Sequence, residues 1–285
     1  MNWKNFITRT LTGALFVAVL VGCILYSTIS FTLLFTLITG LAVWEFGTLI
    51  NNGGQAIVNR PICGLAGVYL FLAVTGFCEN LFGAEAFVPY LLILIYMFVS
   101  ELYRRRPNPI ANWAYMMMSQ LYVALPFAML SVLYFYPVEV MQGGAYTVAV
   151  TPLLPLSVFI FLWASDSGAY LVGSLIGKHR LFERISPKKS WEGSVGGGVL
   201  ALVAAWVLYT FFPIMTLPCW IGMALVVVVF GTWGDLVESL LKRQLGIKDS
   251  GNILPGHGGL LDRFDSAMLA IPAVVVYLYS LSMIL

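Results

Sequence analysis

Residues 216–240 read TLPCWIGMALVVVVFGTWGDLVESL, and residues 241–265 follow directly as LKRQLGIKDSGNILPGHGGLLDRFD. The first segment is long and apolar enough to cross a bilayer as one helix, which needs about 20 apolar residues. The second segment holds four basic residues, three carboxylates and a histidine. Together the two segments predict a membrane helix that ends in a dense polar patch at the membrane surface.

The rest of the chain repeats the apolar pattern. Its 285 residues are 60% hydrophobic and only 10% charged, whereas a soluble domain carries roughly 25% charged residues. We therefore predict an all-α polytopic integral membrane protein, with five helices in residues 1–150 and a catalytic part in residues 151–285. Its nine membrane-spanning segments are 10–27, 30–50, 61–79, 86–103, 112–136, 152–176, 194–212, 216–240 and 266–285.

The placement of charge predicts the topology. With the N-terminus in the cytoplasm, all 15 Lys and Arg residues fall in cytoplasmic segments, as the positive-inside rule requires. The opposite face receives Glu79, Glu85 and Glu139. The polar loops 177–193 and 241–265 then share the cytoplasmic face, so we expect a cytoplasmic-membrane protein whose active site opens to the cytoplasm.

The sequence disfavours cysteine-based sites and nucleic-acid binding. The four cysteines lie scattered in apolar segments without a CxxC pair, which favours small buried side chains over metal ligands or disulfides. No basic stripe lies outside the membrane loops, so nucleic acid is not expected to bind.

The polar residues of 241–265 favour phosphate chemistry. Lys and Arg hold phosphates, carboxylates hold a hard cation such as Mg2+, and glycines let backbone N–H groups approach an anion. These are the parts for metal-assisted phosphoryl or nucleotidyl transfer.

The same residues carry a family resemblance. Ser239-x-x-Lys242-Arg243, then Lys-Asp-x-Gly-x-x-Leu-Pro-Gly-His-Gly-Gly in 248–259, then Asp-Arg-x-Asp in 262–265 resemble the signature of the phosphatidate cytidylyltransferase family. A second block, Ser-Pro-Lys-Lys-Ser-Trp-Glu-Gly in 186–193, is similar to that family's Ser-Pro-Lys-Lys-Thr-Trp-Glu-Gly. Ser190 in place of Thr keeps the hydroxyl group.

The resemblance implies an activity and its partners. The expected reaction, a step of phospholipid biosynthesis, joins CTP and phosphatidate to give CDP-diacylglycerol and pyrophosphate. It implies Mg2+ held by Asp235 and Asp262, a homodimer in the bilayer, and a monovalent cation such as K+ as a further candidate. Asp265 and Asp249 are second-line candidates for the metal site.

The candidate site residues follow from the two blocks and their flanks. The catalytic candidates are Asp235, Asp262, Lys242, Arg263 and His257. The substrate-binding candidates are Ser186, Lys188, Lys189, Ser239, Arg243, Lys248 and Asp166.

Several of these residues also have a purely structural explanation. Asp235 shares a helix face with Ser239 and Lys242, and could simply pair with Lys242 or Arg243; its position at the edge of the hydrocarbon favours function. Helix capping would account for one of Asp262 and Asp265.

Three further residues keep open alternatives. Asp166, in an Asp-x-x-Ala-Tyr context that resembles the family, is either a pocket wall or a buried carboxylate satisfied by serines. His257 either binds phosphate or transfers protons. Glu45 is structural, lines a lipid entrance or snorkels to the interface.

Rival functions remain. A CTP-dependent lipid or polyprenol kinase shares the membrane setting and the nucleotide, but it releases CDP instead of pyrophosphate. A transporter also carries intramembrane acids, yet it needs no Gly-rich basic loop, and the chain has no visible inverted repeat.

Overall fold

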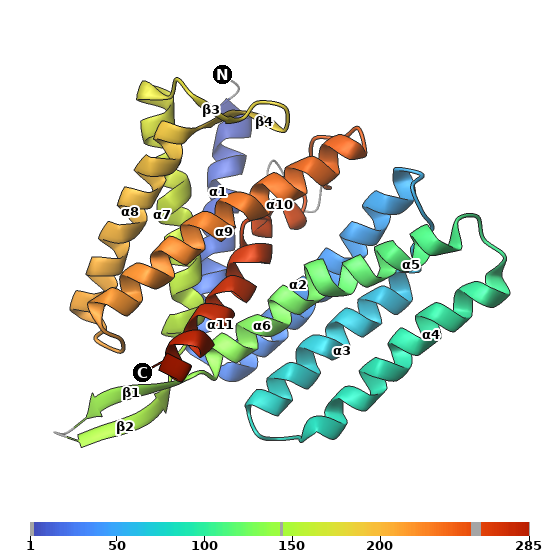
Figure 1. Cartoon of the computed structure of the whole chain (residues 1–285), viewed down its shortest axis with the longest axis horizontal. Coiled ribbons are helices and arrows are strands. Elements are labelled where there is room, and N and C mark those ends of the chain that lie inside the picture. The colour runs from blue at the N-terminus through green and yellow to red at the C-terminus, as the bar shows by residue number, and fades with distance from the viewer. Residues whose placement is uncertain (1–2, 143–144, 252–257, 285) are drawn as a thin grey trace. The chain divides into compact units, whose positions relative to one another are not determined.

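The structure is a computed structural model that describes residues 3–142, 145–251 and 258–284, and helices dominate it (Figure 1). The helical elements are α1 (Trp3–Tyr26), α2 (Thr28–Asn52), α3 (Arg60–Cys78), η1 (Ala84–Phe87), α4 (Val88–Arg104), α5 (Pro109–Met118), the π-helical η2 (Ser119–Ala124), α6 (Leu125–Tyr134), α7 (Leu153–Ile176), α8 (Trp191–Phe211), α9 (Leu217–Gln244), α10 (Leu261–Phe264) and α11 (Ala267–Ile284). The strands are β1 (Pro137–Gln142), β2 (Ala145–Val150), β3 (Arg180–Phe182) and β4 (Ser186–Ser190).

The helices confirm the prediction of an all-α polytopic membrane protein. Among the described residues, eight helical segments are long and apolar enough to cross a membrane. The first predicted segment, 10–27, corresponds to a shorter apolar helix, Thr10–Tyr26. The last candidate span begins at Leu261, earlier than predicted, because α10 precedes α11 almost without a break.

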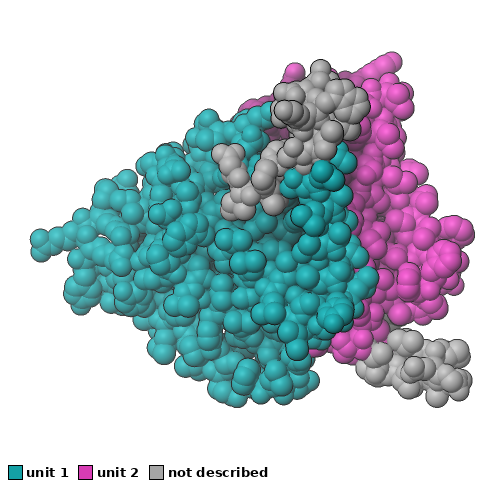
Figure 2. Space-filling model, turned by 180° about the vertical axis from the view of Figure 1, so that it is seen from behind, with its two compact units in different colours: residues 1–132, 241–264 teal, residues 133–240, 265–285 magenta. Residues whose placement is uncertain are grey.

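The described chain divides into two compact units, which Figure 2 colours separately. The first unit holds residues 1–132 and 241–264, and the second holds residues 133–240 and 265–285. The polar segment 241–264 thus belongs with the N-terminal helices.

In the first unit, a serine pair separates α1 from α2. Ser27 is the N-cap of α2, and its side chain accepts a hydrogen bond from the backbone N–H of Ser30 at 3.1 Å. The Ser30 hydroxyl oxygen in turn accepts from the Ser27 N–H at 3.1 Å. This capping box satisfies two backbone donors at the helix start, so two spans form where the apolar run looks continuous.

The core of the first unit is aromatic. Phe35 of α2 lies 5.0 Å from Phe31 and 6.4 Å from Phe127 of α6, measured between ring centroids. Phe31 lies 6.2 Å from Phe71 of α3. All four rings are fully buried, and they fix α2 against α3 and α6.

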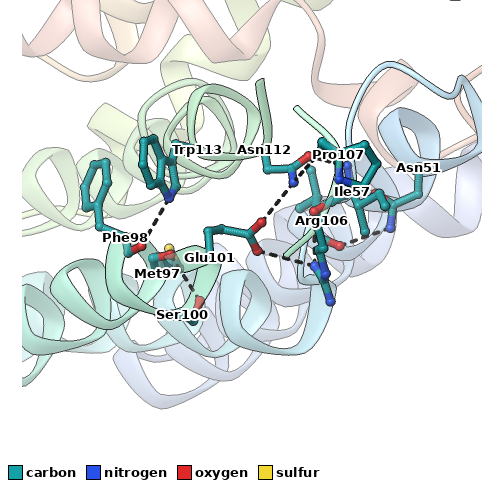
Figure 3. A network of polar contacts seen from close by, with 11 residues as sticks. Asn51, Ile57, Met97, Phe98, Ser100, Glu101, Arg106, Pro107, Asn112 and Trp113 are labelled. Carbon is teal, nitrogen blue, oxygen red and sulfur yellow. Dashed lines mark hydrogen bonds and ion pairs between the residues drawn. The ribbon is translucent and has the colours of Figure 1, made fainter. Parts of the chain in front are cut away.

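A polar network joins α4, α5 and the α2–α3 connection (Figure 3). The buried carboxylate of Glu101 accepts hydrogen bonds from the Asn112 side-chain amide at 2.9 Å and from Arg106 at 3.5 Å. The Asn112 amide oxygen accepts from the Ile57 N–H at 2.7 Å. Arg106 therefore has a structural partner in the buried carboxylate of Glu101.

In the second unit, α7 and α8 meet through glycines. A Cβ on Gly168 would lie 2.6 Å from the Gly196 carbonyl oxygen, and a Cβ on Gly197 would lie 2.6 Å from the Ser165 carbonyl oxygen. Small residues let helices approach closely. Gly196 and Gly197 lie at this contact, whereas a Cβ on Gly198 would meet open space.

Two short antiparallel hairpins interrupt the helices. β1 pairs with β2 ahead of α7, and β3 pairs with β4 between α7 and α8. The β3–β4 hairpin lies in the predicted loop 177–193 and carries Ser186, Lys188 and Lys189. A strand pair of this length was not predicted there.

Candidate functional site

The second unit contains a cavity of about 450 Å3 between α7, α8, α9 and the β3–β4 hairpin. Its polar lining includes Ser165, Asp166, Arg180, Lys188, Lys189 and Thr232. Leu162, Val227 and Val228 supply apolar wall. A cavity of this size with convergent cations suits an organic anion that carries phosphates.

Hydrogen bonds at the start of α8 hold the hairpin in place. The Ser190 hydroxyl oxygen accepts from the Gly193 N–H at 3.1 Å, which caps α8. The Glu192 carboxylate accepts from the backbone N–H groups of Lys178 and His179, both at 3.2 Å, and contacts His179 Nδ1 at 2.6 Å. These bonds connect both ends of the β3–β4 hairpin to the start of α8.

Asp235 has partners on two elements. It accepts a hydrogen bond from the Ser239 hydroxyl at 3.1 Å, which confirms that these two residues share a face of α9. Its other carboxylate oxygen forms an ion pair with Lys189 of β4. The side chains of Asp235 and Lys189 are 27% and 28% exposed, so an ion or a phosphate can still reach them.

Asp166 lies on the cavity wall. Its side chain is exposed, in contrast to the alternative of a buried carboxylate, and neighbouring Ser165 lines the same cavity. Arg180, which is not among the residues predicted from the sequence, also lines it. Arg180 follows α7 by a few residues and belongs to neither sequence motif. It could not be predicted, because only the pairing of β3 with β4 brings it to the cavity.

In the first unit, Asp262 organises the polar segment. Its Oδ1 accepts a hydrogen bond from Lys242 Nζ at 2.7 Å. Its Oδ2 accepts from the backbone N–H groups of Ser250 and Gly259, both at 2.8 Å. The side chains of Asp262 and Lys242 are only 7% and 12% exposed, so this ion pair is largely withdrawn from water.

Glu45 of α2 contacts the same segment. It is 5% exposed, so the alternative in which it snorkels to the interface is wrong. One carboxylate oxygen accepts from the Ser250 hydroxyl, and the other accepts from the Leu260 N–H at 2.7 Å. The apolar run around Glu45 gave no indication of these partners, which lie at the other end of the chain.

The remaining predicted residues have simpler surroundings. Arg243, Lys248 and Arg263 are exposed in the first unit. Asp249 is also exposed there and lines a second, smaller cavity. Asp265 belongs to the second unit, where it accepts from the Ser266 N–H at 2.6 Å. His257 lies outside the described residues.

The carboxylates suit a hard cation by their donor chemistry. Mg2+ prefers one or two protein carboxylates together with substrate phosphates. Asp235 and Asp262 each offer carboxylate oxygens, and a lysine ammonium already lies against each of them. In the described part of the chain no group of three or more His, Cys, Asp or Glu side chains gathers as a complete metal cage, so substrate oxygens would have to complete the shell.

Comparison with known proteins gives a consistent result. The model of the cytidylyltransferase family matches residues 7–281. The chain is 40% identical over 167 residues to the phosphatidate cytidylyltransferase of Staphylococcus haemolyticus (strain JCSC1435), and 41% identical over 167 residues to that of Staphylococcus aureus (strain COL). Each match covers 58% of this chain and 58% of the relative. The chain thus spans somewhat under two thirds of the length of these curated relatives.

Proposed function

Since the chain belongs to the cytidylyltransferase family, we propose that it is a phosphatidate cytidylyltransferase. It would transfer the cytidylyl group of CTP to phosphatidate, giving CDP-diacylglycerol and pyrophosphate. The observation that carries the proposal is the cavity lined by Arg180, Lys188 and Lys189, beside the carboxylate of Asp235. The names of the matched relatives support the choice of substrate.

The reaction brings two anions together. A phosphatidate oxygen forms a bond to the α-phosphorus of CTP, and the bond from that phosphorus to the bridging oxygen breaks, so that pyrophosphate leaves. A phosphate monoester is already nucleophilic at neutral pH, and a strong general base is therefore not required. The main task of the protein is to hold both anions in line and to offset their charge.

Basic side chains that can bind and neutralise the substrate phosphates are present in each unit. In the second unit, Lys188 and Lys189 reach the cavity from β4, and Arg180 reaches it from β3. Ser186 lies on the same strand as the two lysines. In the first unit, the proposed anion-binding residues are Lys242, Arg243, Lys248 and Arg263. Ser239 and Asp166 are proposed to contact substrate through hydrogen bonds.

We propose Mg2+ as the cofactor, with Asp235 and Asp262 as its candidate ligands and Asp265 as a further one. When bound, Mg2+ neutralises phosphate oxygens and polarises the α-phosphorus. Lys189 and Lys242, which pair with the two carboxylates, would remain beside them and also contact substrate phosphates. A monovalent cation such as K+, a homodimeric assembly, and a cytoplasmic-membrane location with the site facing the cytoplasm belong to the same proposal.

One experiment tests the proposed function. Purified protein in detergent is given phosphatidate, Mg2+ and CTP labelled separately at its α- and γ-phosphates. Transfer of the α-label to lipid, with release of pyrophosphate, is the expected result. Transfer of the γ-label to lipid would make the protein a CTP-dependent kinase, and transfer of neither label would contradict both enzymes and favour the transporter.

A further inference from the structure

Two carboxylates hold the same two points of the polar segment in the first unit. At the first point, Ser250 donates its backbone N–H to Asp262 at 2.8 Å and its hydroxyl to Glu45. At the second point, the Gly259 N–H donates to Asp262 at 2.8 Å, and the next N–H, that of Leu260, donates to Glu45 at 2.7 Å. Glu45 and Asp262 therefore act as paired acceptors for both ends of residues 250–260.

The Glu45 contacts lie away from water. Glu45 is 5% exposed, Ser250 8% and Leu260 5%. A buried donor that loses its acceptor costs the full desolvation of that group, which is larger than the net value of an average hydrogen bond. The position of the segment therefore depends strongly on the Glu45 carboxylate.

Two glycines of the signature pack against Glu45. A Cβ on Gly259 would overlap both Glu45 Oε1 and the Ser250 hydroxyl oxygen, and a Cβ on Gly251 would lie 3.1 Å from the Glu45 carboxylate. The absence of a side chain at these positions lets the backbone approach the carboxylate of α2. The glycines of residues 241–265 were interpreted as giving backbone access to an anion, and Gly259 gives this access to an anionic side chain of the protein itself.

We propose that Glu45 is a positioning residue for the reaction. Glu45 lies buried on α2 and fixes the Ser250 hydroxyl and the Leu260 N–H. Ser250 and Gly259, the residue before Leu260, then present their backbone N–H groups to Asp262, which accepts from Lys242 at 2.7 Å. Glu45 touches neither substrate nor metal in this inference, which rests on the proposed function. It acts by setting the orientation of the Asp262 carboxylate and the Lys242 ammonium.

Substitutions at Glu45 test this role through kcat and KM. Glu45→Ala should lower kcat about 100-fold, because a misplacement of roughly 1 Å in a catalytic group has that effect. The KM for CTP should change much less. Glu45→Gln should retain most of the activity, since its amide can accept from the Leu260 N–H and donate to the Ser250 hydroxyl oxygen.

Glu101 provides a matched control. It is a second buried carboxylate of the first unit and also accepts a hydrogen bond from an amide, that of Asn112, but it lies in the network of α4 and α5 (Figure 3). Glu101→Ala should reduce thermal stability as Glu45→Ala does while leaving the kcat of the folded protein near that of the wild type. Equal losses of kcat in the two variants would overturn the inference.

A double variant tests the contact itself. If Glu45 acts through Ser250, Glu45→Ala combined with Ser250→Ala should lose no more activity than Glu45→Ala alone. Multiplied losses would mean that the two side chains act independently, which contradicts the inference.

Hydrogen exchange separates this inference from the proposed function. In detergent, Glu45→Ala should speed exchange in peptides that cover 245–251 and 258–264, and Glu101→Ala should speed it around residue 57 instead. Unchanged exchange at Ser250 and Leu260 in Glu45→Ala would overturn the inference, whatever the activity. A wild-type protein that transfers no cytidylyl group would instead refute the proposed function.

Discussion

Lys188 and Lys189 are neighbours in sequence with different surroundings. Both line the cavity of the second unit, but only Lys189 also pairs with Asp235. Lys188→Ala should therefore raise the KM for CTP or phosphatidate about tenfold, which corresponds to the loss of one charge-assisted hydrogen bond of roughly 1.5 kcal/mol, and leave kcat near its original value.

Lys189→Ala should lower kcat as well, because Asp235 loses the cation that orients it. Steady-state kinetics of the two single variants measure the difference, with Lys188→Arg and Lys189→Arg as charge-conserving controls. Identical kinetic behaviour of the two alanine variants would show that the ion pair with Asp235 has no role in turnover.

Substitution of Asp235 and of Asp262 should lower the stability of the protein by different amounts. Asp235→Asn and Asp262→Asn are both expected to abolish Mg2+-dependent turnover while the protein still inserts into the membrane. Asp262→Asn should also lower stability by about 3 kcal/mol. The Asn amide oxygen can still accept from the Ser250 and Gly259 N–H groups, but its NH2 group then faces Lys242, whose charge is left uncompensated in a largely buried place. Asp235→Asn should cost little, since its ion pair is partly exposed.

Thermal melting in detergent, together with turnover across a range of Mg2+ concentrations, checks this pair. Substantial Mg2+-dependent turnover in either variant would remove that carboxylate from the metal proposal. Equal melting temperatures would contradict the different burial of the two ion pairs.

The sequence motifs predicted several residues of the candidate site, but few of the partners that these residues have in the structure. The spacing of Asp235 and Ser239 predicted that they share one helix face, where they form a hydrogen bond. The pairing of Asp235 with Lys189 and of Glu45 with Ser250 could not be predicted, because each depends on how distant elements pack. Helical periodicity describes neighbours within one helix only.

At the scale of elements, the α7–α8 contact depends on single glycines. Gly197 faces the Ser165 carbonyl oxygen, whereas adjacent Gly198 faces open space. Gly197→Ala should destabilise the second unit by about 1–3 kcal/mol through overpacking. It should also raise the KM for CTP, because both helices line the cavity. Gly198→Ala should be neutral or stabilise α8 by up to about 1 kcal/mol.

Melting curves and KM values of these two neighbouring variants give a direct comparison. If Gly198→Ala lowered the melting temperature as much as Gly197→Ala, the close contact between α7 and α8 would not explain the effect of either substitution. Helix propensity or contact with the bilayer would then determine stability at both positions.

The helices could be predicted from sequence because each apolar run is about one bilayer thickness long. The β3–β4 hairpin could not. Ser186–Ser190 is short, contains a proline and carries two lysines, and such a segment lacks the alternating apolar pattern that indicates a strand. Its pairing is fixed by the cap at Ser190 and by Glu192, which are local hydrogen bonds and not a periodic signal.

At the scale of the whole molecule, the predicted topology is testable by labelling. In a variant without Cys23, Cys63, Cys78 and Cys219, single cysteines at Lys178 or Gly246 should react with a membrane-impermeant maleimide only from the cytoplasmic side. A cysteine at Phe82 should react only from the opposite side. Labelling in intact cells and in inverted vesicles measures this, and reversed accessibility at either loop would overturn the N-in arrangement.

The composition of the two compact units could not be predicted from the order of the spans. That order suggests a division near residue 150. The structure groups residues 241–264 with the N-terminal helices, because the contacts of Glu45 and Phe127 with this segment connect the two ends of the sequence. Span counting contains no information on such contacts.

The hold of Asp262 on Ser250 and Gly259 has a consequence for how this region can change. Because the two N–H groups share one carboxylate oxygen, the chain between them is closed at its base. The entropy of closing such a loop grows only slowly with length, by about 0.6 kcal/mol for each doubling. Insertions between these residues should therefore change the free energy of folding very little while they lower turnover strongly. The catalytic activity of this stretch can then change in evolution while the membrane helices keep their fold.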